Sequence, residues 1–117
     1  MKLKLITSVF LNVTQSCNLR CKYCFVQQAP RTMTYEECRD AVHFVAQNAQ
    51  IQGDKPSINY FGGEPTLMWD TIIVPLTEYI RKTYGKDFAI SMTSNGILLD
   101  KEKLEWMKEN DIGLLFS

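Results

Sequence analysis

Residues 57–65 read SINYFGGEP, a short run with large apolar residues that ends in two glycines and a proline. A run containing Ile, Tyr and Phe and bounded by glycine is typical of a strand. Proline suits the first turn of a helix, because its missing amide hydrogen would have no partner there. We therefore predict a strand over Ser57–Phe61, a turn over Gly62–Pro65 and a helix beyond the turn.

The residues on the N-terminal side of this stretch predict a helix. Thr34 and Glu37 have the spacing of a capping box, in which each side chain accepts a hydrogen bond from a backbone amide of the first turn. Apolar residues then recur at steps of three and four over residues 38–49, which is the pattern of one buried helix face. Gly53 ends this helix.

Strands and helices also alternate on the C-terminal side. Pro75 lies inside the next helical window, so we expect that helix to start late or to kink there. Gly85 is a stop signal, and Asp100 is the predicted N-cap of the last helix. The predicted strands are Leu5–Val13, Ser57–Phe61, Phe88–Thr93 and Ile112–Phe116, and the predicted helices begin near Thr34, cover Trp69–Tyr84, and run from Asp100 to about Asn110.

Strands that alternate with helices predict an α/β fold with a parallel sheet and right-handed crossovers. Binding sites in such sheets form at the carboxyl ends of the strands. Three loops of unusual composition follow strands directly here, at residues 14–31, 62–65 and 94–96. Because the carboxyl ends of parallel strands share one edge, we expect these loops to build a single site.

The first of these loops carries Cys17, Cys21 and Cys24, separated by three and then two residues. Thiols this close in sequence can converge on one metal centre. A cubane cluster usually takes four thiolates on its four irons, so three thiolates leave one iron open to a small molecule. The spacing leaves a zinc knuckle, or a disulfide with a spare thiol, as alternatives.

The remaining cysteine and the single histidine fit other roles. Cys38 lies in the apolar stripe of the first helix, so we expect a buried thiol and not a fourth ligand. His43 lies about 130° from the centre of that stripe at ~100° per residue, which predicts a solvated surface histidine.

Three motifs together resemble the radical S-adenosylmethionine (radical SAM) superfamily. An aromatic residue, Tyr23, stands directly before the last cysteine of the triplet, as in the CxxxCxΦC signature of that family. The GGEP sequence at residues 62–65 matches a second family motif, and SNG at residues 94–96 matches a segment that often contacts the nucleotide. The resemblance covers residues 5–117.

The resemblance implies a partial (β/α) barrel. The core of the superfamily has six strands, whereas this chain supplies about four parallel strands and three helices. Residues 1–117 are therefore expected to form the N-terminal portion of a radical SAM core domain, with an incomplete barrel. The last two strand–helix units complete the adenosine site and the substrate pocket in this family, so we do not expect catalysis from the isolated segment.

The resemblance also implies two cofactors. These are a [4Fe–4S] cluster on Cys17, Cys21 and Cys24, and S-adenosylmethionine bound through its amine and carboxylate to the open iron. One-electron reduction then splits S-adenosylmethionine into methionine and a 5′-deoxyadenosyl radical, which takes a hydrogen atom from the substrate. The cofactors carry this chemistry, and the protein positions them.

Residues from all three loops are expected to contact S-adenosylmethionine. Glycines lack side chains, so the backbone of the GGE turn can approach the methionine ammonium closely. The hydroxyl and amide of the SNG segment suit ribose hydroxyls or a carboxylate, with turn formation as the alternative role. The aromatic residues of the cysteine loop can face the adenine or pack within the loop. The predicted contacts are Gly62, Gly63 and Glu64, then Ser94 and Asn95, and finally Tyr23 and Phe25.

The spacing of the GGEP motif is most similar to the subgroup that modifies peptides and proteins, whose SPASM-type members carry further cluster cysteines in a C-terminal extension. The leading prediction is thus an oxidoreductase acting on a peptide or protein substrate. Its electron would come from a one-electron reductant such as flavodoxin or ferredoxin. The alternatives are a radical SAM enzyme acting on a small molecule and a non-catalytic metal- or iron–sulfur-binding module.

Composition bears on partners and location. The 13 Lys and Arg residues balance 13 Asp and Glu residues. We expect no nucleic-acid partner, because phosphate binding needs a basic excess. No apolar run approaches the ~20 residues of a membrane span, and the N-terminus does not resemble a signal peptide. We therefore expect a cytoplasmic protein without a membrane partner, whose 4 cysteines are thiols or ligands and not disulfides.

Overall fold

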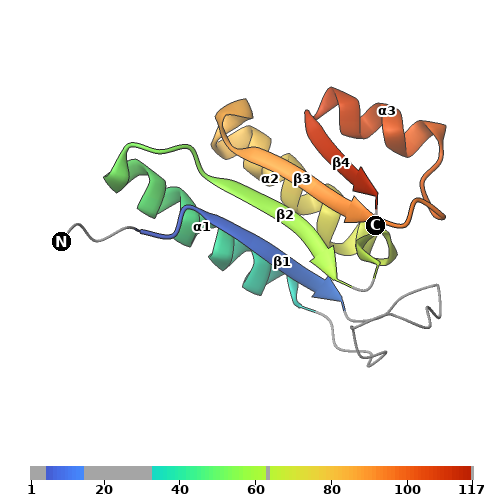
Figure 1. The fold of residues 1–117 in the computed structure, drawn as a ribbon, viewed down its shortest axis with the longest axis horizontal. Helices are drawn as coiled ribbons and strands as arrows, with labels where there is room; N and C mark the ends of the chain where they lie inside the picture. Colours follow the sequence, from blue (N-terminus) through green and yellow to red (C-terminus); the bar gives the residue numbers. More distant parts are fainter. Residues whose placement is uncertain (1–4, 15–32, 63, 117) are drawn as a thin grey trace.

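The computed structural model describes residues 5–14, 33–62 and 64–116. At its centre is one sheet of four parallel strands that lie side by side in chain order (Figure 1). This confirms the predicted α/β class and the parallel sheet, which is not closed into a barrel within these residues. The strands are β1 (Ser8–Thr14), β2 (Ser57–Gly62), β3 (Ala89–Ser94) and β4 (Ile112–Phe116).

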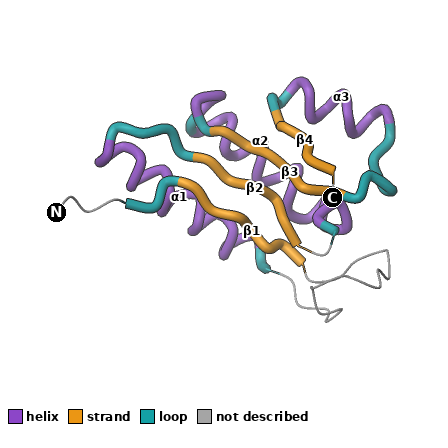
Figure 2. Tube along the Cα trace, viewed as in Figure 1, coloured by secondary structure: helices purple, strands orange, loops and turns teal. Residues whose placement is uncertain are grey.

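Helical segments make the connections between the strands that the structure describes (Figure 2). In Figure 1, α1 and α2 lie behind the sheet and α3 lies beside β4. Among the described residues, no helix has both the length and the apolar character needed to cross a membrane. The helices are α1 (Tyr35–Gln52), the 3₁₀ helix η1 (Pro65–Met68), the π-helix η2 (Trp69–Ile73), α2 (Val74–Thr83), the 3₁₀ helix η3 (Gly85–Asp87) and α3 (Lys101–Glu109).

The helix starts follow the capping signals in the sequence. The hydroxyl of Thr34 accepts a hydrogen bond from the amide of Glu37 at 3.1 Å, and the Glu37 carboxylate accepts one from the amide of Thr34 at 3.0 Å. Asp100 accepts a hydrogen bond from the amide of Lys103 at 2.8 Å. Both predicted caps are confirmed, and each satisfies backbone donors that a helix start leaves without partners.

The second helix has a more complex start than predicted. Pro75 is the second residue of α2, and the five residues before α2 form a π-helix in which the amide of Val74 donates to the carbonyl of Trp69. Proline removes one regular helical hydrogen bond and crowds the carbonyl of the residue four positions earlier. The prediction that the regular helix starts late is confirmed. The π-helix has no signal in the sequence that we recognised.

The hydrophobic core lies between the sheet and its helices. Every second residue of a strand points into it, as with Leu11 and Val13 of β1 and Met92 of β3, all at most 2% exposed. The buried hydroxyl of Tyr60 forms a hydrogen bond of 2.8 Å with the hydroxyl of Thr77 on α2. This bond satisfies a polar group in the core and links the sheet to α2.

Arg81 of α2 joins the two connections at the amino edge of the sheet. Its guanidinium donates hydrogen bonds to the carbonyl oxygens of Gly85 (2.8 Å), Phe88 (2.6 Å) and Asn110 (2.8 Å). Gly85 and Phe88 precede β3, and Asn110 precedes β4. One side chain therefore fixes the entry of two neighbouring strands.

We expect Arg81→Ala to lower the free energy of unfolding by about 2–3 kcal/mol, because it leaves three carbonyls without a charged donor. Urea unfolding followed by circular dichroism measures the loss. Its matched control is Lys82→Ala, an exposed neighbour on the same helix, which should change stability by no more than about 0.5 kcal/mol. Equal unfolding midpoints for the two variants would contradict this role of Arg81.

Candidate functional site

The carboxyl ends of the four strands meet at one edge of the sheet, where the arrowheads in Figure 1 point. Thr14 at the end of β1 pairs with Gly62 at the end of β2, and Ser94 of β3 pairs with Phe116 of β4. The segments that follow β2 and β3 therefore begin close together. Six predicted site residues lie outside the described residues: Cys17, Cys21, Tyr23, Cys24, Phe25 and Gly63.

Gly62 marks the point where β2 passes into the GGEP turn. Its φ angle is 140°, in a region that residues with side chains rarely adopt. The backbone here requires glycine independently of any ligand.

The side chain of Glu64 joins the second loop to the third. It is fully buried, at 0% exposure. One carboxylate oxygen, Oε1, accepts a hydrogen bond from the amide of Asn95 at 2.7 Å, and Oε2 accepts one from the hydroxyl of Ser94 at 2.8 Å. Oε2 also accepts from the amide of Thr66 at 3.2 Å and from the Thr66 hydroxyl. One carboxylate therefore holds the start of η1 against the end of β3.

The polar groups of the SNG segment also bond within their own turn. The Ser94 hydroxyl, only 1% exposed, accepts a hydrogen bond from the amide of Gly96 at 3.0 Å. The side-chain oxygen of Asn95 accepts one from the amide of Ile97 at 3.0 Å. These are the turn contacts that the sequence analysis gave as the alternative role. Contact of Ser94 and Asn95 with S-adenosylmethionine stays a prediction.

Gly96 brings the third loop against β4. Its φ angle is 82°, and a Cβ atom placed there would lie 2.9 Å from Cε1 of Phe116. That separation is too short for a side chain without a shift of the ring. Glycine therefore allows the SNG turn to lie directly against the end of β4.

The face of the sheet away from α1 and α2 carries polar and aromatic residues that the sequence analysis did not single out. The side-chain nitrogen of Asn59 donates a hydrogen bond to the hydroxyl of Ser91 at 2.7 Å. The side-chain oxygen of Asn59 accepts one from the hydroxyl of Thr93 at 3.3 Å. The rings of Phe10 and Phe61 lie 5.6 Å apart on this face. These residues alternate along the strands with the buried core residues, and this alternation in the sequence could have predicted that they share the opposite face. In barrels of parallel strands, this is the face that lines the interior.

Cys38 is a core residue, as predicted. Its side chain is 0% exposed on α1. Burial raises the pKa of the Cys38 thiol from 9.0 to about 11, and the nearby Glu37 carboxylate adds to the rise. Within residues 5–14, 33–62 and 64–116, no three His, Cys, Asp or Glu side chains are grouped so that they could hold a metal ion. Cys38 is therefore not part of a metal site in this part of the chain.

We expect the Cys38 thiol to resist alkylation in the folded protein, because only a thiolate reacts and both burial and the raised pKa suppress it. A variant with Cys17, Cys21 and Cys24 replaced by serine isolates this thiol. Near pH 8 its reaction with iodoacetamide should be at least about 100-fold slower than that of the urea-unfolded chain. Equal rates would contradict the burial of Cys38.

The same thiol predicts a loss of stability at alkaline pH. Because the folded pKa lies above the unfolded value, the stabilisation is complete below about pH 9 and disappears as the pH rises through the folded pKa. A pKa that is higher by about two in the folded state corresponds to at most about 2–3 kcal/mol of unfolding free energy. Comparing urea midpoints of this triple variant with and without Cys38→Ala at several pH values isolates the contribution. An equal pH dependence would contradict it.

His43 lies at the surface, but it is not simply solvated. Its Nδ1 lies 2.7 Å from the hydroxyl of Tyr84, and its Nε2 lies 2.7 Å from the hydroxyl of Tyr79. The two tyrosines come from the region of α2, so the imidazole links α1 to that helix. The sequence showed the exposure of His43 but gave no sign of these partners, which are more than thirty positions away.

Comparisons with known proteins agree with this arrangement. The family model described as "Radical SAM superfamily" matches residues 11–116. Molybdenum cofactor biosynthesis protein 1 of Dictyostelium discoideum is 34% identical over 116 residues, which cover 93% of this chain and 17% of that protein. GTP 3',8-cyclase of Chlorobaculum tepidum is 34% identical over 94 residues, covering 80% of this chain and 27% of that protein.

A solved structure has the same fold. Native anSMEcpe with bound AdoMet and the Cp18Cys peptide superimposes with a TM-score of 0.70 at 23% identity, over 92% of this chain and 29% of that chain. This chain therefore spans less than one third of each of these three proteins. The arrangement of β1 to β4 with their helices therefore corresponds to part of the longer anSMEcpe chain.

Proposed function

The chain belongs to the radical SAM superfamily, and from this membership we propose that the protein is a radical enzyme that binds a [4Fe–4S] cluster and S-adenosylmethionine (AdoMet). We assign the cluster to Cys17, Cys21 and Cys24. The observation that carries the proposal is the shared sheet edge. There β1 ends three residues before the first cysteine, and Glu64 ties the GGEP turn to the SNG turn.

The donor set fits a cluster with one open iron. Three thiols follow β1 within eight residues, whereas Cys38 is buried on α1 and unsuited to act as a fourth ligand. A cubane held by three thiolates keeps one coordination position for another ligand. A cluster held by these three thiolates would, when reduced, supply the one electron for cleavage of AdoMet to methionine and a 5′-deoxyadenosyl radical, the species that would take a hydrogen atom from the substrate.

The residues of this chain contribute position and exclusion of water. In our proposal the backbone at Gly62 and Gly63 binds the methionine ammonium, because glycine has no side chain of its own to keep a ligand away. Asn95 and the SNG backbone face the nucleotide, and Glu64 acts through them as a positioning residue. Its carboxylate is fully used by Ser94, Asn95 and Thr66, so it holds the two turns in register and need not touch AdoMet itself.

For the substrate we propose a peptide or protein side chain, with a flavodoxin- or ferredoxin-like reductant. The GGEP spacing supports this, and so does the likeness in fold to anSMEcpe, which was solved with a peptide. A small-molecule substrate is the second candidate, because a relative at 34% identity is a GTP 3',8-cyclase. We place the protein in the cytoplasm, since an open iron needs a reducing compartment.

The substrate class is tested with the complete protein after anaerobic reconstitution. We expect a peptide fraction from the source cells to raise the rate of 5′-deoxyadenosine formation above the rate without substrate. Protease treatment of that fraction should abolish the effect, and GTP should have none. Stimulation by GTP, or by a fraction that resists protease, would favour the small-molecule candidate and refute the peptide proposal.

A further inference from the structure

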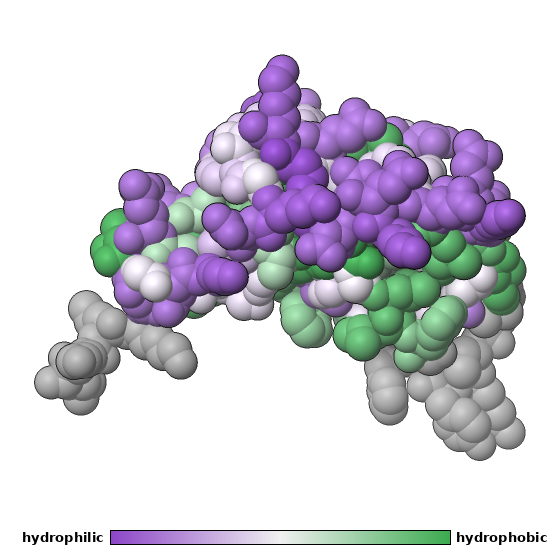
Figure 3. All heavy atoms as spheres, turned by 90° about the horizontal axis from the view of Figure 1, so that it is seen from above, coloured by the Kyte–Doolittle hydropathy of each residue, from purple (hydrophilic) through white to green (hydrophobic). Residues whose placement is uncertain are grey.

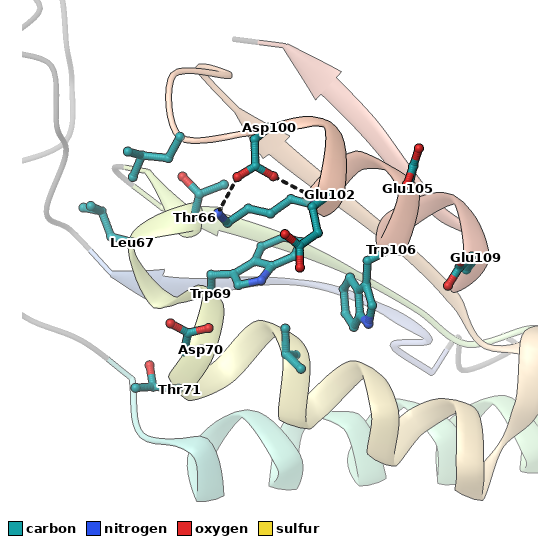
Figure 4. A pocket seen from close by; sticks show the side chains of 13 residues that line it. Thr66, Leu67, Trp69, Asp70, Thr71, Asp100, Glu102, Glu105, Trp106 and Glu109 are labelled. Atoms are coloured by element: carbon teal, nitrogen blue, oxygen red, sulfur yellow. Dashed lines mark hydrogen bonds and ion pairs between the residues drawn. The ribbon is translucent and has the colours of Figure 1, made fainter.

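A groove lies between α3 and the helical segments η1 and η2, next to the GGEP and SNG turns. It encloses about 740 Å³, which is in the range of ligand-binding clefts. Trp69 of η2 and Trp106 of α3 both line it, and their rings meet edge to face with centroids 5.1 Å apart (Figure 4). An aromatic pair of this kind offers ring faces to which cations are attracted.

The groove already holds one cation of the chain itself. The ammonium of Lys103 lies 5.7 Å from the centre of a Trp69 ring and 3.3 Å from the carboxylate of Asp100. This is the one salt bridge found among the described residues. The pair shows that the geometry of the groove suits a positive charge placed between a carboxylate and an indole.

The other four carboxylates of the groove form no salt bridge with any residue that the structure describes. The groove is lined by five acidic side chains against the single ammonium of Lys103, although the chain as a whole has a formal charge of zero. Three of the acidic residues share one face of α3 with Trp106, at steps of three and four. The face of the molecule seen from above, on the α3 side, is mainly hydrophilic (Figure 3). The acidic residues are Asp70, Asp100, Glu102, Glu105 and Glu109.

We propose that this groove binds a basic segment of a partner polypeptide, with arginine or lysine side chains over the indoles and beside the α3 carboxylates. The charge favours such a segment and repels nucleic acid and anionic lipid. Glu105 and Glu109 are about 6 Å apart along the helix axis. Side chains two positions apart in an extended peptide are about 6.6 Å apart. Two alternate basic residues therefore match two carboxylates. Among the described residues, no three His, Cys, Asp or Glu side chains are grouped so that they could hold a single metal ion instead.

The chain carries its own reporter for this proposal. Its 2 tryptophans both line the groove, so intrinsic fluorescence responds directly to an occupant. The probe is a capped peptide in which three arginines alternate with serine, titrated into the full chain. Its counterpart has citrulline, which is neutral, in place of each arginine. We expect saturable fluorescence changes with the arginine peptide that weaken as salt is added, and no saturation with the citrulline peptide.

Charge-neutral variants test the carboxylates without changing side-chain shape. We expect the double variant Glu105→Gln/Glu109→Gln to weaken binding of the arginine peptide about five- to tenfold. Its matched control is Glu78→Gln, an exposed residue of α2 outside the groove, which should leave the affinity unchanged. Circular dichroism of each variant confirms that the helices remain.

Three results would overturn the proposal. They are equal binding of the citrulline peptide, unchanged affinity in the double variant, and binding of spermidine as tight as that of the arginine peptide. The last would mark a site for small cations and not for a polypeptide. None of these measurements depends on the cluster or on AdoMet, so the outcome is independent of the proposed enzymatic function.

Discussion

Replacing Cys17, Cys21 or Cys24 by alanine, one at a time, is expected to abolish stable cluster binding. A cubane already held by three thiolates would be left with two, and two open irons would expose it to solvent and oxidants. After anaerobic reconstitution, the unaltered protein should be brown and carry about four irons per chain. Each single variant should lose most of this iron and the absorbance that accompanies it.

The fourth cysteine provides the matched control. Cys38 is buried on α1, and burial raises the pKa of its thiol, so Cys38→Ala should leave the iron content unchanged. Loss of iron from this variant equal to that of Cys21→Ala would contradict the assignment of three ligands. A colourless protein that binds one zinc ion would favour the non-catalytic module instead.

Replacing Glu64 by alanine is expected to have the second-largest effect, on both stability and cofactor affinity. The change removes the buried acceptor of four donors, which are the amides of Asn95 and Thr66 and the hydroxyls of Ser94 and Thr66. Each unsatisfied buried donor costs about 1–3 kcal/mol, so we expect a loss of about 4 kcal/mol in unfolding free energy. The two turns would also lose their register, so AdoMet affinity should fall more than iron content.

Two milder variants separate these contributions. Ser94→Ala removes the hydrogen bond to Glu64 and the one from the Gly96 amide, and should cost about 2 kcal/mol. Glu64→Gln keeps the shape but places an amide donor where the carboxylate accepted, and its cost should lie between the two. Unfolding in urea, an AdoMet titration and an iron assay give the three readouts. If Glu64→Ala lost iron but kept its AdoMet affinity, the positioning role would be wrong.

Local signals in the sequence accounted for most of the fold. The Thr34–Glu37 capping box, the Asp100 cap and the bounds of β4 were predicted residue by residue, because caps and short strands depend on neighbouring residues. The π-helix over Trp69–Ile73 was missed. No residue pattern distinguishes a π-helix from an α-helix here, and we attribute the π-helix to the way the helix packs around Pro75.

Contacts between distant residues could not be predicted in the same way. The sequence placed Glu64 and Ser94 in one site through the rule for parallel strands, but not the bond between them, which spans thirty positions. The same holds for Arg81 on three carbonyls and for Trp69 against Trp106. Such pairs depend on how side chains from separate elements pack together, and local sequence patterns do not predict this packing.

The most direct test of the proposed open coordination position on the cluster is whether the reduced protein cleaves AdoMet. The complete protein, reconstituted anaerobically and reduced with dithionite in the presence of AdoMet, should release 5′-deoxyadenosine that chromatography detects, and the Cys21→Ala variant should release none. A brown protein with its full iron content that leaves AdoMet intact under these conditions would contradict the assignment of an open iron to this cysteine triplet.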